Sequence, residues 1–271
     1  MNRSHISPCA LGIGALGAAL IVALLRSATF AFAFDRTAGY CSPGVLSTLL
    51  YIALALALAG CVGGAVIAVA MARRQDEDVT FTPEKRSPAV KLSSLLIALA
   101  CVAAAVYSVY CWAQGASALM LVYALAALLA IPYFVPAKPI ATFAWFGLGV
   151  LAACVLSAAI EYFDVSVAMN SPVKLMQQFA ALSIAIYFLS ELYALTGKMQ
   201  PRRTLLFGSI AVVLGVSNGI TNIVAAMIGG ILTPDYLVRS LVLLTLGLYV
   251  AARLMTARRI PSAQNQQSEE A

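Results

Sequence analysis

Two trios of polar side chains interrupt a sequence that is otherwise strongly apolar. In each trio the second and third residues follow the first at i+3 and i+4, a spacing that places all three on one face of a helix. The trios are Lys174, Gln177 and Gln178, and Asn218, Thr221 and Asn222. Ammonium, amide and hydroxyl groups arranged in this way can hydrogen-bond a small polar solute. They can instead hydrogen-bond neighbouring helices, and both interpretations stay open.

Further polar residues extend this candidate ligand site. Asp164 precedes Lys174 by ten residues and is the nearest counter-charge for its ammonium group, with Asn170 between them. Arg239 is expected at the same end of the apolar segments. The residues predicted to converge on one water-accessible cavity are Asp164, Lys174, Gln178 and Asn222.

Other charged residues map to the same ends of the apolar segments. They are Arg26, Asp35, Arg36 and Glu161. For Asp35 and Arg36 we favour interfacial positions, where the side chains reach toward water.

A second charged pair is expected at the opposite end of the chain's apolar segments. Glu191 lies 17 positions beyond Lys174 in the same segment, and Arg253 should lie at the same depth in the last one. A carboxylate there could relay a proton. A structural ion pair between Glu191 and Arg253 is the interpretation that we favour.

The residue types argue against catalytic and metal-dependent chemistry. The six cysteines form no CxxC motif and the single histidine is His5, so the usual zinc ligand sets are missing and no cofactor is implied. No nucleophile–base constellation is visible, which disfavours an enzyme. Cys41 and Cys111 are expected on one side of the membrane and could pair in an oxidising compartment, but the sequence provides no distance between them.

Composition identifies the solvent of this chain as a bilayer. Of its 271 residues 62% are hydrophobic and 10% are charged, with a mean hydropathy of +0.92, whereas soluble domains carry about 25% charged residues. Eight apolar runs are long enough to cross a membrane as helices, and they show no strand-like alternation. They are roughly 8–30, 44–72, 92–113, 117–136, 139–161, 173–197, 204–228 and 235–256. The predicted fold class is an all-α integral membrane protein with about eight transmembrane helices.

Positive charge predicts the orientation of these helices. With a cytoplasmic N-terminus, 13 of the 17 Lys and Arg residues fall on the inner side and 4 on the outer side. We therefore expect a multi-pass cell-membrane protein with both termini in the cytoplasm. The net charge of +6 then reflects topology signals facing anionic lipid, and no nucleic acid is implied as a partner.

The start of the chain allows a second interpretation. "AFAF" after an apolar run resembles a signal-peptide cleavage site, but the run is long and Arg26 interrupts it, so we expect the first helix to be retained.

A short internal match suggests that the bundle has two halves. "FDRTAGYCSP" at 34–43 and "FDVSVAMNSP" at 163–172 align without gaps, and each follows the first helix of a set of four. Ser-Pro is also a common start signal for any helix, which is the competing explanation. We predict two parallel four-helix halves, 1–136 and 137–259, followed by a disordered cytoplasmic tail at 260–271.

One stretch resembles known proteins. "YFDVSVAMNSPVKLMQQFAALSIAIYFLSELYALTG" at 162–197, with "PRR" at 201–203, resembles uncharacterised polytopic membrane proteins of Clostridia-type bacteria. The resemblance covers the second half of the chain and rests on Asn170-Ser171-Pro172, Lys174, Gln178 and Glu191. It implies a bacterial inner-membrane protein and supplies no activity.

Two functions are therefore predicted for testing. The first is a small-solute permease with a polar pocket open to the outer side. The alternative is a non-transporting membrane subunit or sensor that binds a partner protein through its polar helix faces. The lipid bilayer is the expected surrounding in either case, and the sequence does not determine the oligomeric state.

Overall fold

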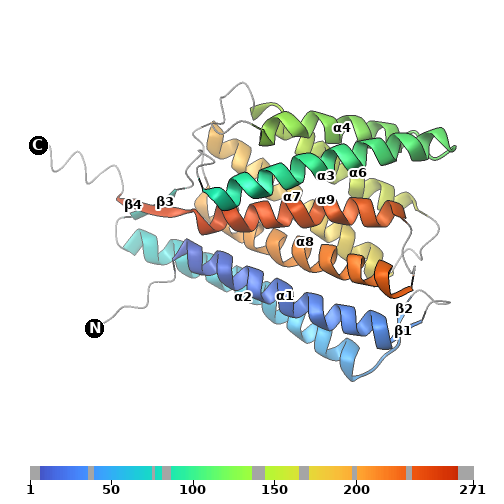
Figure 1. The fold of residues 1–271 in the computed structure, drawn as a ribbon. Coiled ribbons are helices and arrows are strands. Elements are labelled where there is room, and N and C mark those ends of the chain that lie inside the picture. Colours follow the sequence, from blue (N-terminus) through green and yellow to red (C-terminus); the bar gives the residue numbers. More distant parts are fainter. Residues whose placement is uncertain are drawn as a thin grey trace, which may run out of the picture.

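The computed structural model describes residues 7–35, 40–74, 77–80, 87–135, 144–164, 171–196, 200–229 and 234–261. Arg36, Asn170 and residues 262–271 lie outside these ranges. Long helices dominate the described chain and run back and forth along one direction (Figure 1). They are α1 (Pro8–Phe32), α2 (Val45–Arg74), α3 (Pro88–Ala113), α4 (Leu119–Phe134), α6 (Gly147–Phe163), α7 (Pro172–Leu195), α8 (Pro201–Gly229) and α9 (Pro234–Met255).

Two pairs of short antiparallel strands mark the two ends of the bundle, and only the first pair is a hairpin (Figure 1). β1 (Phe34–Asp35) pairs with β2 (Tyr40–Cys41) between α1 and α2. β3 (Glu77–Thr80) pairs with β4 (Arg258–Pro261) at the end where α1 begins and α9 ends. We call these the hairpin end, marked by β1–β2, and the terminal end, marked by β3–β4. Because β4 extends to Pro261, the prediction of a disordered tail from residue 260 is wrong at its first two residues.

Among the helices of the described residues, six are long and apolar enough to cross a membrane. The two shorter ones, α4 and α6, have 16 and 17 residues and are apolar. At a rise of 1.5 Å per residue they extend about 24–26 Å, less than the roughly 30 Å of a bilayer core, so the predicted eight spans are not confirmed. Large apolar side chains are exposed along the outside of the bundle, among them Leu24, Leu56 and Leu99. A surface of this kind suits lipid rather than water.

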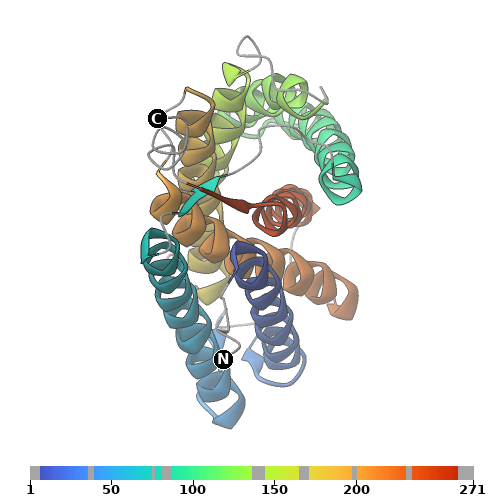
Figure 2. The ribbon, with the colours of Figure 1, turned by 90° about the vertical axis from the view of Figure 1, so that its left-hand side faces the viewer.

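Six helices close a ring. In order, α3, α4, α6, α7, α8 and α9 each pack against the next, and α9 packs against α3. α1 and α2 lie outside this ring, where α1 packs on α8 and α9 and α2 packs on α1 and α8. Figure 2 shows the bundle from the terminal end, with α1 and α2 at one side of the ring and α3 and α4 at the other.

The packing does not confirm the predicted repeat of four helices. In a repeat α2 would correspond to α7 and α3 to α8, yet α7 packs along α8 whereas α2 does not pack along α3 in the described chain. Ser171 is the N-cap of α7 and Pro172 its first residue, whereas α2 begins only at Val45, three residues after Ser42. Ser7-Pro8 and Ser87-Pro88 also start helices, so Ser-Pro is a recurrent entry signal in this chain and does not by itself indicate a repeat.

Candidate functional site

Gln177 is the centre of a buried polar cluster at the hairpin end. Its side-chain carbonyl Oε1 accepts hydrogen bonds from Nδ2 of Asn222 at 2.8 Å, from Oγ of Ser240 at 2.9 Å and from Nδ2 of Asn218 at 3.2 Å. Its Nε2 donates to Oε1 of Glu161 at 2.9 Å. The amide therefore joins helices α6, α7, α8 and α9, which are four neighbouring members of the ring.

Arg239 supplies the positive charge on the α9 side of this cluster. Its Nη2 lies 3.0 Å from Oε1 of Glu161 and 2.6 Å from Oδ2 of Asp235, one turn earlier on the same helix. Glu161 and Arg239 are almost fully buried, whereas Asp235 is partly exposed. A carboxylate and a guanidinium that are both removed from water stabilise each other in the charged form.

Arg26 joins the cluster from α1, outside the ring. Its Nη1 donates to Oδ1 of Asn218 at 2.6 Å, and Asn218 in turn donates to Gln177, which donates to Glu161. In this series of three hydrogen bonds, each donor lies on the Arg26 side and each acceptor on the Glu161 side. Aligned bonds of this kind polarise one another, so two amides carry the interaction between Arg26 and Glu161.

Close packing of α8 on α9 brings the polar faces together. A Cβ atom added at Gly219 would come within 3.1 Å of the backbone oxygen of Ser240, so only glycine permits this approach without a shift of one helix. Asn222, three residues later, then reaches Oγ of Ser240 at 2.7 Å. Thr221 faces α1 instead, and its hydroxyl donates to the backbone oxygen of Ser217 at 2.7 Å.

We define the hairpin-end cluster as Arg26, Glu161, Gln177, Asn218, Asn222, Asp235, Arg239 and Ser240. Of the residues predicted for the ligand site, Gln177, Asn218, Asn222 and Arg239 are in contact within it. Lys174 is buried nearby and donates to the backbone carbonyl of Asp164. Thr221 lies on the α1 side of α8. The position of Asn170 is outside the described residues.

Two details of the predicted site require correction. Gln177 rather than Gln178 meets Asn222, because Gln178 is turned to the partly exposed side of α7. The predicted water-accessible cavity is also wrong for these side chains: Lys174 is 2% exposed, and Gln177, Asn218 and Asn222 are 0% exposed. The polar groups satisfy one another in a closed arrangement.

Sequence reasoning also missed members of the cluster. Glu161 and Arg26 were placed at the correct end but not assigned to the site, and Asp235 and Ser240 were not considered. The spacing of Asp235 and Arg239 at i and i+4 is a detectable signal for an ion pair on one helix. Arg26 has no such signal, because its partner Asn218 lies 192 residues away.

A second, smaller cluster lies at the terminal end. Nε of Arg253 and Oε1 of Glu191 are 2.9 Å apart, so the predicted ion pair is present, and the hydroxyl of Tyr249 donates to the same oxygen at 3.1 Å. Phe188 stacks on Tyr249 with ring centroids 5.8 Å apart, and Phe134 of α4 meets Tyr249 edge to face at 5.4 Å. We call Glu191, Tyr249 and Arg253 the terminal-end cluster.

An apolar layer separates the two clusters. Gln177 and Glu191 are 14 residues apart on α7, as are Arg239 and Arg253 on α9, which corresponds to about 21 Å along each helix. Between them most buried positions are apolar, including Ala181 and Ile184 on α7 and Leu243 and Leu246 on α9, and the buried hydroxyls of Ser183 and Thr245 donate to backbone oxygens of their own helices.

The described residues provide no alternative chemistry for the site. They contain no group of three or more His, Cys, Asp or Glu that could hold a metal ion. All six cysteines are free thiols, so Cys41 and Cys111 are not paired.

The class of protein follows from the fold. Six apolar helices of membrane-spanning length, with apolar side chains facing outward and polar ones enclosed, have the architecture of a multi-pass helical membrane protein. No protein family, no characterised protein and no solved structure matches this chain. The predicted resemblance to Clostridia-type membrane proteins thus stays a prediction, and function has to be argued from the site.

Proposed function

We propose that this protein is a small-solute permease of the bacterial inner membrane and that the hairpin-end cluster recognises its solute. The observation that carries the proposal is the burial of charged and amide side chains from four neighbouring ring helices in an otherwise apolar bundle. Burying such groups away from water is costly, and ionisable residues inside membranes are concentrated at solute and ion pathways for that reason.

The hydrogen-bond donors and acceptors that the cluster leaves unused indicate the class of solute. Three buried atoms have no hydrogen-bond partner among the described residues. They are the acceptor Oδ1 of Asn222 and the donors Nε and Nη1 of Arg239. A solute that offers both a donor and an acceptor would satisfy these groups. Amino acids and small amides combine an N–H donor with a carboxylate or carbonyl acceptor, and they are the class that we propose.

Transport by this protein requires movement of the ring helices. The layer between the two clusters buries no charged or amide side chain of α7 or α9 among the described residues, and the hydroxyls of Ser183 and Thr245 bond within their own helices, so the solute passes only when the helices rearrange. Opening at the hairpin end exposes Gln177 and Asn222 to water, and opening at the terminal end separates Glu191 from Arg253. In this proposal the protein has eight spans with both termini in the cytoplasm, in accord with the bias of positive charge.

The partner-binding alternative has weaker support. A partner's transmembrane helix would contact the outside of the bundle, where the exposed side chains are mainly large and apolar. The polar faces of α7 and α8 point toward each other instead, as the hydrogen bonds between Gln177 and Asn222 require. A subunit or sensor that recognises a partner through these polar faces would first have to open them.

Two neighbouring glutamines provide the test. Uptake of radiolabelled amino acids and small amides into proteoliposomes is measured for the wild type, Gln177→Ala and Gln178→Ala. Gln177 is bonded to four partners in the cluster, whereas Gln178 lies on the adjacent, partly exposed side of α7. We expect Gln177→Ala to reduce uptake at least about tenfold, corresponding to the loss of one or two hydrogen bonds, and Gln178→Ala to be near wild type.

The outcome separates the proposal from its alternative. A folded wild-type protein that moves no solute in the panel, or equal uptake by both glutamine variants, would contradict a solute site at the hairpin-end cluster. Co-purification of a stoichiometric membrane partner in the first case would favour the subunit or sensor.

A further inference from the structure

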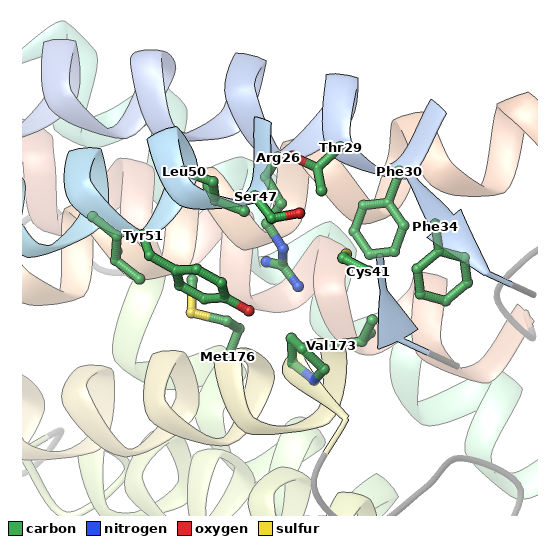
Figure 3. Close-up of a pocket in the computed structure, with 12 residues that line it drawn as sticks. Arg26, Thr29, Phe30, Phe34, Cys41, Ser47, Leu50, Tyr51, Val173 and Met176 are labelled. Carbon is green, nitrogen blue, oxygen red and sulfur yellow. The ribbon is translucent and has the colours of Figure 1, made fainter. Parts of the chain in front are cut away.

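A pocket lies beside Arg26, on the side of α1 that faces α2 and α7 (Figure 3). α2 contributes Leu50, Tyr51 and Leu54 to its walls, and α7 contributes Pro172, Val173 and Met176. The β1–β2 hairpin closes it with Phe34 and Cys41. In Figure 3 the guanidinium of Arg26 points into the space between Tyr51, Val173 and Met176. The pocket therefore has one charged group on an otherwise mostly apolar wall.

Arg26 has binding capacity that the hairpin-end cluster does not use. Its side chain is 3% exposed, and Nη1 donates to Asn218, but Nη2 has no hydrogen-bond partner among the described residues. Among the carboxylates whose side chains the structure describes, which do not include Asp35, none lies within 4 Å of this guanidinium, in contrast to those of Arg239 and Arg253. An arginine stays protonated at physiological pH, so its charge favours an anionic group in the pocket.

The other groups of the pocket do not supply that negative charge. Burial raises the pKa of the Cys41 thiol above its ordinary value, so this side chain is neutral at pH 7. Ser47 donates its hydroxyl to the backbone oxygen of Ser42. The first turn of the 24-residue helix α7 borders the pocket at Pro172 and Val173, and the positive end of its dipole adds to the attraction for an anion.

The size and location of the pocket limit the ligand. Its cavity volume of about 30 Å³ is far below the several hundred Å³ that a whole drug-sized molecule needs, so one small anionic group fits and the rest of the ligand lies outside. Tyr51 on the pocket wall is 52% exposed on the outer surface of the bundle, beside the exposed Ile52. Outside the pocket the ligand would thus lie against apolar, lipid-facing side chains.

We propose that this pocket binds the phosphate of an acidic phospholipid from the bilayer leaflet at the hairpin end and that Arg26 is the residue that binds it. The guanidinium donates through Nη2 to a phosphate oxygen, and the acyl chains lie along the exposed apolar face of α2. A phosphate bound here is linked through Asn218 and Gln177 to Glu161, so the lipid stabilises the closed hairpin-end cluster. The proposal does not depend on which solute the protein carries or on whether it carries one.

Thermal unfolding in nanodiscs tests the site. The full-length protein is placed in nanodiscs of phosphatidylcholine alone and in nanodiscs of phosphatidylcholine with phosphatidylglycerol. A third sample contains phosphatidylcholine nanodiscs with added inorganic phosphate. For lipid at about ten times its dissociation constant we expect phosphatidylglycerol to raise the Tm of the wild type by about 3–6 °C. Arg26→Gln should lose this shift, and native mass spectrometry should show one retained phosphatidylglycerol on the wild type only.

Two further variants make the result specific. Arg203→Gln removes an exposed arginine at the start of α8 and should keep the full shift, because general attraction of acidic lipid to surface cations is not the mechanism. Leu54→Trp fills the pocket while retaining Arg26, and it should abolish the shift even if Arg26→Gln does not fold. An undiminished shift in both Arg26→Gln and Leu54→Trp would overturn the proposal. A shift caused by inorganic phosphate alone would overturn the lipid as the source of the anion.

Discussion

At the terminal end one carboxylate and one guanidinium meet directly, whereas at the hairpin end the charges are distributed over several residues. Glu191 bonds Arg253 at 2.9 Å. Glu161 contacts Arg239, which is shared with Asp235, and it is connected to Arg26 only through Gln177 and Asn218.

This difference indicates different tasks for the two ends. Separating Glu191 from Arg253 leaves two buried charges without each other, which is unfavourable in an apolar surrounding. The hairpin-end cluster can exchange one hydrogen bond for another, because its amides donate and accept at several positions. In the proposed permease a solute would therefore compete for contacts at the hairpin end at a lower cost than at the terminal end.

The largest expected effect is the loss of one member of the terminal-end pair. Glu191→Leu should lower the free energy of unfolding by about 3–5 kcal/mol, because Arg253 is left buried beside an apolar side chain. The double variant Glu191→Leu with Arg253→Leu should recover most of this loss. Thermal unfolding of the purified protein in detergent measures both. If the double variant is no more stable than the single one, the pair is not a self-contained unit.

Neutralising the hairpin-end carboxylate should have a smaller effect. Glu161→Gln removes the negative charge, yet Arg239 keeps Asp235 at 2.6 Å and the new amide retains hydrogen-bonding capacity. We expect a loss of about 1–3 kcal/mol, less than for Glu191→Gln measured in the same way. The reverse order would show that the shared charges of the hairpin-end cluster are no more adaptable than a direct pair.

A single hydroxyl should have a moderate effect at the hairpin end. Ser240→Ala removes a group that bonds both Gln177 and Asn222, and we expect a loss of about 1 kcal/mol. Ser183→Ala on α7 is the matched control, since that buried hydroxyl donates only locally, to the backbone oxygen of Ala180, among the described contacts. The control should change stability by less than about 0.5 kcal/mol. Equal losses in the two variants would argue against a cooperative cluster.

The membrane side of each end can be assigned without affecting stability. Gln75→Cys and Ser166→Cys, each in a background without native cysteines, should react with a membrane-impermeant thiol reagent from opposite sides of the membrane. The bias of positive charge predicts that Gln75 is cytoplasmic and Ser166 is outside. Labelling of both residues from the same side would contradict the predicted topology and with it the assignment of the hairpin end to the outer face.

Local features of the sequence were enough to predict the helices and one ion pair, between Glu191 and Arg253. Apolar runs and Ser-Pro entries placed most of the helices to within a few residues, because hydropathy and capping depend on neighbouring residues alone, but the run predicted from 139 corresponds to α6, which begins only at Gly147. Glu191 and Arg253 could be paired because both lie near the same end of long apolar helices. Spacing also predicted that the polar faces of α7 and α8 meet.

The choice between Gln177 and Gln178, the closed state of the cluster and the contribution of Arg26 required the tertiary structure. Consecutive residues point about 100° apart around a helix, so the rotation of α7 decides which glutamine faces Asn222. Sequence spacing specifies a face but not that rotation, which is set by packing against neighbours such as α6 and α8. Arg26 reaches Asn218 because α1 packs on α8 from outside the ring, and this contact between distant segments exists only in the folded bundle.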